Sequence, residues 1–143
     1  MRLRIVSVIL LLLSGLLPIA LVPTSHAAGS GDPTGPWLTE DGSAVVHVAS
    51  CAQALCATIV WSEKPVDARG EKLCGMAVLG GAVSSGPASW SNGWIYSPKA
   101  NAKYPVELSL PGDSKFHLHF SAGLFGRDLV WTRPSQAFTP CTP

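Results

Sequence analysis

The chain is 143 residues long, and its 10 Lys and Arg residues nearly balance its 9 Asp and Glu residues. Two of the basic residues, Arg2 and Arg4, lie at the very start of the chain, so the remainder is close to neutral. A near-neutral chain has no basic stripe for the phosphates of nucleic acids and no polybasic patch for anionic lipids. Nucleic acid is therefore not expected as a partner.

Residues 1–27 have the pattern of a secretory signal peptide. After the two arginines, residues 5–22 are almost wholly apolar, and Ser25-His26-Ala27 places small residues at the two positions that a signal peptidase reads. The apolar run is also near the lower length limit of a membrane-spanning helix, but Gly15 and Pro18 interrupt it. We therefore expect cleavage after Ala27, export, a single domain over residues 28–143, and no stable membrane insertion of the product.

The rest of the chain shows short strand-like segments separated by turn residues, and no segment of useful length has a helical period. Alternation is clearest on either side of Pro111-Gly112-Asp113, which predicts a hairpin. The predicted strands are residues 37–39, 44–49, 57–61, 76–83, 93–96, 104–110, 115–120 and 129–133. About eight strands joined mostly by short turns favour an all-β, antiparallel up-and-down meander that closes into a single barrel.

All four cysteines lie after the predicted cleavage site, and an exported protein favours disulfides. Cys51 and Cys56 flank the turn of a predicted hairpin, which would bring their Cβ atoms within disulfide reach. The remaining pair, Cys74 and Cys141, would tie the C-terminal tail to the middle of the chain. A zinc site is the alternative, but it has only one close pair, and the spacing is not that of a zinc ribbon or finger.

A series of short motifs, in this order and spacing, resembles the DUF2147 family of exported bacterial proteins. The motifs are Gly35-Pro36-Trp37, Thr39-Glu40-Asp41-Gly42, the Cys51 and Cys56 pair followed by Ile59-Val60-Trp61, Gly93-Trp94-Ile95-Tyr96-Ser97-Pro98, Gly123-Leu124-Phe125-Gly126-Arg127 and Trp131-Thr132-Arg133. The resemblance implies a calycin-like, lipocalin-type barrel in the bacterial periplasm with a small hydrophobic, fatty-acid-like ligand.

In a calycin-like barrel, Trp37 on the first strand would plug the closed end and Arg133 from the last strand would lie over its ring. We expect this pair to act as a structural lock. The expected ligand would take the inward faces of the strands. The candidate lining residues are Val46, Val48, Ile59, Trp61, Tyr104, Val106, Leu108, Phe116, Leu118 and Phe120. The alternative is that these side chains simply fill the barrel, as they can in a barrel of about eight strands.

Two histidines raise the question of a metal site. His117 and His119 are two positions apart and share one face of a predicted strand, with His47 as a third ligand only if the fold brings it near. Because the opposite face of that strand is apolar, we expect both histidines to face solvent and expect no metal.

The sequence has no pattern that favours catalysis or a cofactor. It lacks a Gly-x-Ser-x-Gly nucleophile motif, and its serines sit among Gly, Pro and Asn as turn formers. Gly80-Gly81 follows a strand-like run but opens no helix, so it is not a phosphate-binding loop. We expect no enzymatic activity, no catalytic residue and no cofactor.

The alternative to a ligand carrier is a structural or protein-interaction module of the cell envelope with a filled barrel. Its working surface would be an outer aromatic patch of Trp90, Trp94 and Tyr96, beside the turn at residues 91–93. The protein partners of such a module are not indicated by the sequence.

Overall fold

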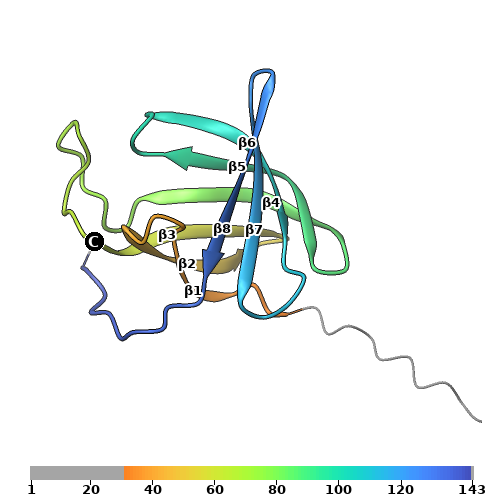
Figure 1. Cartoon of the computed structure of the whole chain (residues 1–143), viewed down its shortest axis with the longest axis horizontal. Coiled ribbons are helices and arrows are strands. Elements are labelled where there is room, and N and C mark those ends of the chain that lie inside the picture. The colour runs from red at the N-terminus through yellow and green to blue at the C-terminus, as the bar shows by residue number, and fades with distance from the viewer. Residues whose placement is uncertain (1–30, 143) are drawn as a thin grey trace, which may run out of the picture.

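The computed structural model describes residues 31–142 and shows a closed barrel in which each strand pairs antiparallel with its neighbours in sequence (Figure 1). The strands are β1 (Gly35–Leu38), β2 (Ala44–Cys51), β3 (Ala54–Ser62), β4 (Ala77–Gly86), β5 (Ser89–Ser97), β6 (Ala102–Ser109), β7 (Lys115–Ala122) and β8 (Phe125–Thr132). The ring closes where Leu38 of β1 pairs with Thr132 of β8. The predicted all-β, up-and-down barrel is confirmed.

The signal peptide predicted at residues 1–27 lies outside the described residues. Between residues 31 and 142 the chain forms no helix long and apolar enough to cross a membrane.

Because successive strands run in opposite directions, the connections gather at two ends of the barrel. One end carries the segment before β1 and the connections β2–β3, β4–β5 and β6–β7. The other end carries the connections β1–β2, β3–β4, β5–β6 and β7–β8, of which the β3–β4 loop is the longest (yellow-green in Figure 1). The first of these is called the closed end and the second the open end.

The core fills the half of the barrel nearest the closed end. Phe116 lies at its centre, with ring centroids 5.2 Å from Trp37, 5.9 Å from Trp90 and 6.3 Å from Trp131. Tilted and edge-on aromatic pairs at these separations stabilise the core beyond the apolar area that they bury. Leu110, directly after β6, is also fully buried.

Several strands are longer than the sequence predicts. β4 continues through Ser84 and Ser85, and β5 begins at Ser89, because these polar and small residues still pair through their backbones. Backbone pairing does not require alternating apolar side chains, so the sequence of such a segment resembles that of a turn.

A β-bulge corrects the prediction for Trp61. The pairing of β2 with β3 shifts between Val45 and Val46, so that Val46 pairs with Ile59 whereas Val45 pairs with Trp61. Adjacent residues of a strand face opposite sides of a sheet, so Trp61 lies on the face opposite Val46. The prediction that Trp61 lines the interior was therefore wrong.

Both predicted disulfides are confirmed. Cys51 is bonded to Cys56 across the β2–β3 hairpin, and Cys74 is bonded to Cys141. The second bond holds the C-terminal tail against the barrel, where the backbone N–H of Cys141 also donates to the carbonyl of Val60 at 2.7 Å.

Candidate functional site

A cavity of about 1570 Å³ opens at the end of the barrel formed by the connections β1–β2, β3–β4, β5–β6 and β7–β8. Its walls are the inward faces of strands above the aromatic core. The apolar residues of its deeper walls include Ala44, Val46, Ile59, Leu73, Val78, Ile95, Tyr104, Phe120, Leu129 and Trp131. At its inner end Val46 and Ile59 are almost fully buried, so the open space lies in the upper half of the barrel and toward the mouth.

Four of the ten predicted lining residues lie in this cavity: Val46, Ile59, Tyr104 and Phe120. Tyr104 and Phe120 face each other with ring centroids 5.4 Å apart. Five others pack deeper in the buried core beneath the cavity, namely Val48, Val106, Leu108, Phe116 and Leu118. Trp61 is not on the cavity wall, for the reason given above.

Much of the wall that β8 supplies was not among the predicted lining residues. Leu129 and Trp131 line the cavity, and so does Arg127, because it is two residues further along the same face. Arg127 is the pairing partner of Phe120 on β7, which places both at the mouth. The alternation of residues 127, 129 and 131 is the signal that could have shown this wall.

The carboxylates on the rim of the cavity are mostly engaged in holding their own loops. Glu40 accepts a hydrogen bond from the backbone N–H of Val130 at 3.1 Å, which supports the short β1–β8 contact. Asp41 accepts from the hydroxyls of Thr39 and Ser43, each at 2.8 Å. Partial burial alone would raise the pKa of Asp41, but the hydrogen bonds from Ser43 and Thr39 outweigh it and lower the pKa.

Asp67 organises the β3–β4 loop in the same way. Its side chain accepts from the backbone N–H groups of Arg69 and Glu71 and forms an ion pair with Arg69 at 3.0 Å. Arg69 also donates to the hydroxyl of Tyr96 at 2.8 Å, which ties the loop to β5. Loss of hydration opposes these hydrogen bonds, yet the pKa of Asp67 is lowered overall.

The cations on the rim are not used in this way. Lys64, Lys99 and Arg127 line the cavity, and within residues 31–142 no carboxylate lies at ion-pair distance from any of them. Glu63 is the one rim carboxylate without a side-chain hydrogen bond in that part of the chain. These three cations are therefore free to pair with an acidic group on a molecule that enters, while Glu40 and Asp41, whose donors are neutral, keep their own negative charge.

At the closed end, Arg133 lies over the indole of Trp37, with its guanidinium carbon 3.7 Å from the ring centroid. The guanidinium also donates to three backbone carbonyls of the N-terminal segment, those of Asp32 at 2.6 Å, Thr34 at 2.9 Å and Pro36 at 3.2 Å. This geometry is the one expected for the lock, and it seals the barrel below the core.

Gly35 leaves the space that the guanidinium of Arg133 occupies. It has a φ of 98°, and a Cβ at that position would lie 3.2 Å from Nη1 of Arg133. A side chain there would both strain the backbone and press on the guanidinium. The glycine of the Gly-Pro-Trp motif therefore serves the closing contact.

The two histidines of β7 face outward, on the wall of a separate polar groove of about 590 Å³. His119 contacts Asp128 at 2.7 Å between Nδ1 and Oδ1. Among residues 31–142, no three His, Cys, Asp or Glu side chains are grouped so that they could hold a metal ion.

The hypothetical outer aromatic patch is smaller than its sequence suggests. Trp90 turns inward onto Phe116, as described above. Trp94 does face outward, but it lies against Gly80 of β4 and under the ammonium of Lys103, 4.0 Å from the ring centroid. Tyr96 is held by hydrogen bonds to Arg69 and Asn101.

A closed antiparallel barrel of eight strands, plugged at one end and open at the other, is a lipocalin-like fold. One solved structure with this fold is protein HP1028 from the human pathogen Helicobacter pylori, described as a member of the lipocalin family. It matches with a TM-score of 0.63 and 17% sequence identity, over 73% of this chain and 84% of that chain. No curated protein matches the chain by sequence.

Residues 35–133 match the family model described as an uncharacterized protein conserved in bacteria, DUF2147. The chain belongs to the DUF2147 family. The resemblance seen in the sequence motifs is thereby confirmed.

Proposed function

We propose that this protein is an exported carrier that binds a small hydrophobic, fatty-acid-like ligand in the open half of its barrel, without a catalysed reaction. The observation that carries the proposal is the division of the interior into a sealed aromatic core and a large apolar cavity open at one end. A cavity lined by apolar and aromatic side chains with a few polar groups at its mouth is the usual form of a small-molecule site.

The ligand gains affinity mainly from its hydrocarbon part. Transfer of apolar surface from water contributes about 0.8 kcal/mol for each buried CH₂ group. The wall residues Val46, Ile59 and Phe120 supply the apolar surroundings for such a chain.

The rim favours an acidic head group on that ligand. The guanidinium of Arg127 and the ammonium groups of Lys64 and Lys99 have no carboxylate partner in residues 31–142, whereas the neighbouring Asp41 and Asp67 are engaged in their loops. A carboxylate at the mouth would give Arg127 a charge-assisted hydrogen bond while the alkyl chain lies deeper.

The two disulfides support export, because such bonds persist in oxidising compartments. A lipocalin-like barrel of this kind would work in the periplasm, where an apolar molecule needs protection from water.

The carrier function is tested by titrating delipidated protein with dodecanoic acid in a calorimeter. Val46→Trp should abolish uptake, because Val46 lies on the cavity wall and the indole would occupy the space. The matched control is His47→Trp, which places the same indole on the exposed outer face of the same strand and should leave uptake unchanged. If wild-type protein takes up no acid, the alternative of an envelope interaction module is favoured.

The head-group preference is tested separately with dodecanol. Wild-type protein should bind the acid more tightly than the alcohol, and Arg127→Gln should weaken binding of the acid by about tenfold while leaving the alcohol unchanged. Lys103→Gln is the control, because Lys103 lies over Trp94 on the outer surface. Equal affinity for acid and alcohol would leave the carrier in place and remove the role of Arg127.

A further inference from the structure

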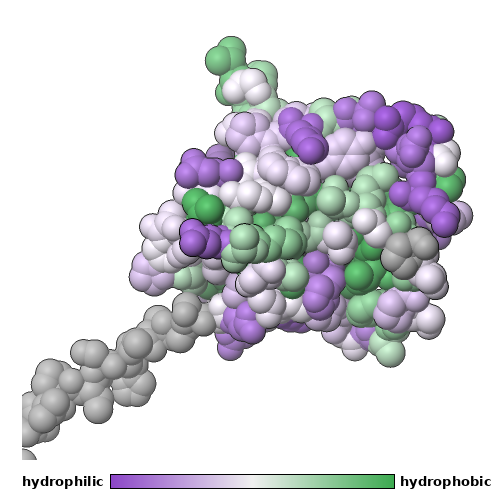
Figure 2. Space-filling view, turned by 180° about the vertical axis from the view of Figure 1, so that it is seen from behind, coloured by the Kyte–Doolittle hydropathy of each residue, from purple (hydrophilic) through white to green (hydrophobic). Residues whose placement is uncertain are grey.

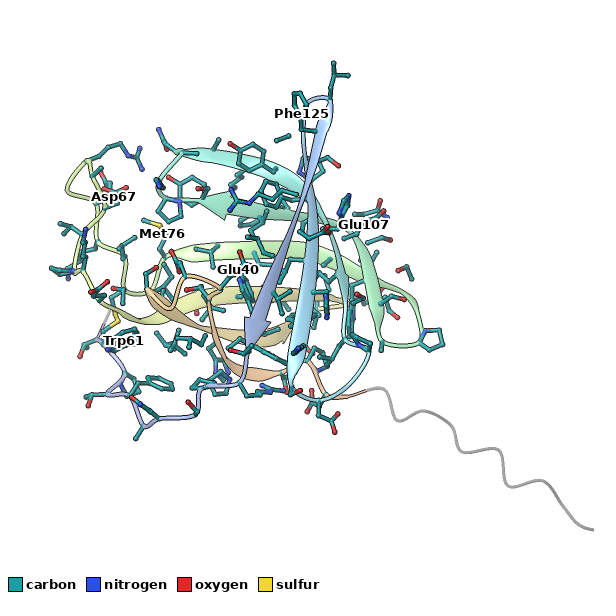
Figure 3. All side chains as sticks on the ribbon, viewed as in Figure 1. Glu40, Trp61, Asp67, Met76, Glu107 and Phe125 are labelled. Atoms are coloured by element: carbon teal, nitrogen blue, oxygen red, sulfur yellow. A yellow bond between two sulfur atoms is a disulfide. The ribbon has the colours of Figure 1, made fainter. Side chains whose placement is uncertain are left out.

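The tip of the β7–β8 hairpin exposes two large apolar side chains. Leu124 is 99% exposed and Phe125 is 79% exposed, far more than any other large hydrophobic residue in the described part of the chain. Figure 3 shows Phe125 at the end of the hairpin, and in Figure 2 the tip stands clear of the surface as an apolar projection. Adjacent exposed apolar side chains of this kind mark a contact site.

The tip borders the mouth of the cavity. Phe125 and Arg127 belong to its lining, and Val66, the next most exposed large hydrophobic residue, lines it from the β3–β4 loop. The exposed apolar surface and the cavity opening therefore share one end of the molecule. The unpaired cations Lys64 and Lys99 lie on the same rim.

The shape of this surface limits its partner. A stable protein interface covers about 800 Å² on each side. Two side chains at the tip of a narrow hairpin offer about 400 Å² at most, since a large aromatic side chain buries about 150–250 Å². A second copy of this chain or another folded protein is therefore poorly matched to the tip, whereas a lipid layer accommodates a narrow apolar wedge.

We propose that the open end docks onto the surface of a lipid bilayer, with Leu124 and Phe125 inserted among the acyl chains. The cations of the rim, Lys64, Lys99 and Arg127, then face acidic head groups. This places the cavity mouth against the hydrocarbon, so that an apolar molecule passes between membrane and barrel without crossing water. The inference goes beyond ligand binding, because docking requires only the tip and the rim.

The test is sedimentation of the ligand-free protein with vesicles of mixed phosphatidylcholine and phosphatidylglycerol. Wild-type protein should sediment with the vesicles. The double variant Leu124→Ser, Phe125→Ser should bind at least about tenfold more weakly, because each of these side chains loses its transfer from water. Circular dichroism verifies that the variant is folded.

The matched control is Val83→Ser, which removes an exposed apolar side chain from β4 outside the cavity lining and should bind vesicles like the wild type. Two results would overturn the proposal. One is a wild-type protein that stays in the supernatant or binds no better than the double variant. The other is self-association in vesicle-free ultracentrifugation that the double variant abolishes, which would assign the tip to a second copy. Neither result bears on uptake of dodecanoic acid, so failure here is distinct from failure of the carrier function.

Discussion

Arg133 joins the last strand to the segment that precedes the first. Its guanidinium combines a cation–π contact with Trp37 and hydrogen bonds to the carbonyls of Asp32, Thr34 and Pro36. Only one backbone pair, Leu38 with Thr132, connects β1 to β8, so this side chain supplies much of the closure that the ladder lacks. Burial lowers the pKa of Arg133, with Asp32 and Asp113 acting in the opposite direction, but a guanidinium stays charged at neutral pH.

We predict that Arg133→Lys lowers the free energy of unfolding by about 2 kcal/mol. The ammonium of lysine lacks the planar fork of donors with which the guanidinium reaches three carbonyls. Urea denaturation followed by tryptophan fluorescence measures the loss. The control Arg127→Lys, at the exposed mouth, should change stability by less than about 0.5 kcal/mol. Equal effects of the two substitutions would contradict the role given to the lock.

Asp41 makes the stability of the β1–β2 turn depend on pH. Its pKa in the folded protein lies below the ordinary value of 3.8, so folding favours the ionised carboxylate. This contribution is complete above pH 3.8 and is lost as the pH falls through the folded-state pKa. Asp41→Asn should therefore be less stable than the wild type at pH 7, and the difference should shrink in acid. A difference that is constant from pH 7 to pH 2 would show that the charge of Asp41 has no part in it.

At the scale of single residues, the lock pair was expected from the family resemblance, and the disulfide pairs from the hairpin at Cys51 and Cys56, which leaves Cys74 for Cys141. The position of Trp61 was not predictable, since one extra residue in β3 reverses the side that it faces. The partners of the charged side chains on the rim were also not predictable, because they can be far apart in sequence. Glu40 and Val130, for example, are 90 residues apart.

At the scale of elements, the packing of β4 against β5 depends on a glycine. Trp94 of β5 lies so close to Gly80 of β4 that a Cβ on Gly80 would approach Cζ2 of the indole to 2.7 Å. Lys103 of β6 covers the same ring. Gly80 therefore leaves the space on β4 that the indole of Trp94 occupies across the strands.

We predict that Gly80→Ala lowers the free energy of unfolding by about 1–3 kcal/mol, because the tryptophan must move to make room. In a Trp94→Ala background the same change should cost much less, so urea denaturation of the four variants should show strong coupling. Gly112→Ala is the control, since a Cβ there has no neighbour within 4 Å. Additive effects of the two substitutions would rule out the contact as the cause.

The order and number of strands were predictable from the alternation of apolar residues and from the turns. Their ends were not, because the serine-rich termini of β4 and β5 pair without apolar side chains. The length of the β7–β8 hairpin was also underestimated, because its tip carries exposed Leu124 and Phe125 where a turn is expected to be polar.

At the scale of the whole molecule, the barrel combines a solid half and a hollow half. The aromatic cluster of Trp37, Phe116 and Trp131 fills the closed end, while the cavity lies among the strands and connections of the open end. Sequence alone identifies inward-facing residues but not their height along the barrel axis, which depends on strand register and tilt. For that reason the predicted lining set mixed cavity residues with core residues.

Native mass spectrometry of protein exported to a bacterial periplasm and purified without detergent shows whether the barrel carries a hydrophobic ligand. A carrier should show a discrete added mass that is released on unfolding, or that forms when the bare protein is incubated with a mixture of fatty acids, and Val46→Trp should prevent it. A bare mass that stays unchanged after this incubation would rule out the carrier function.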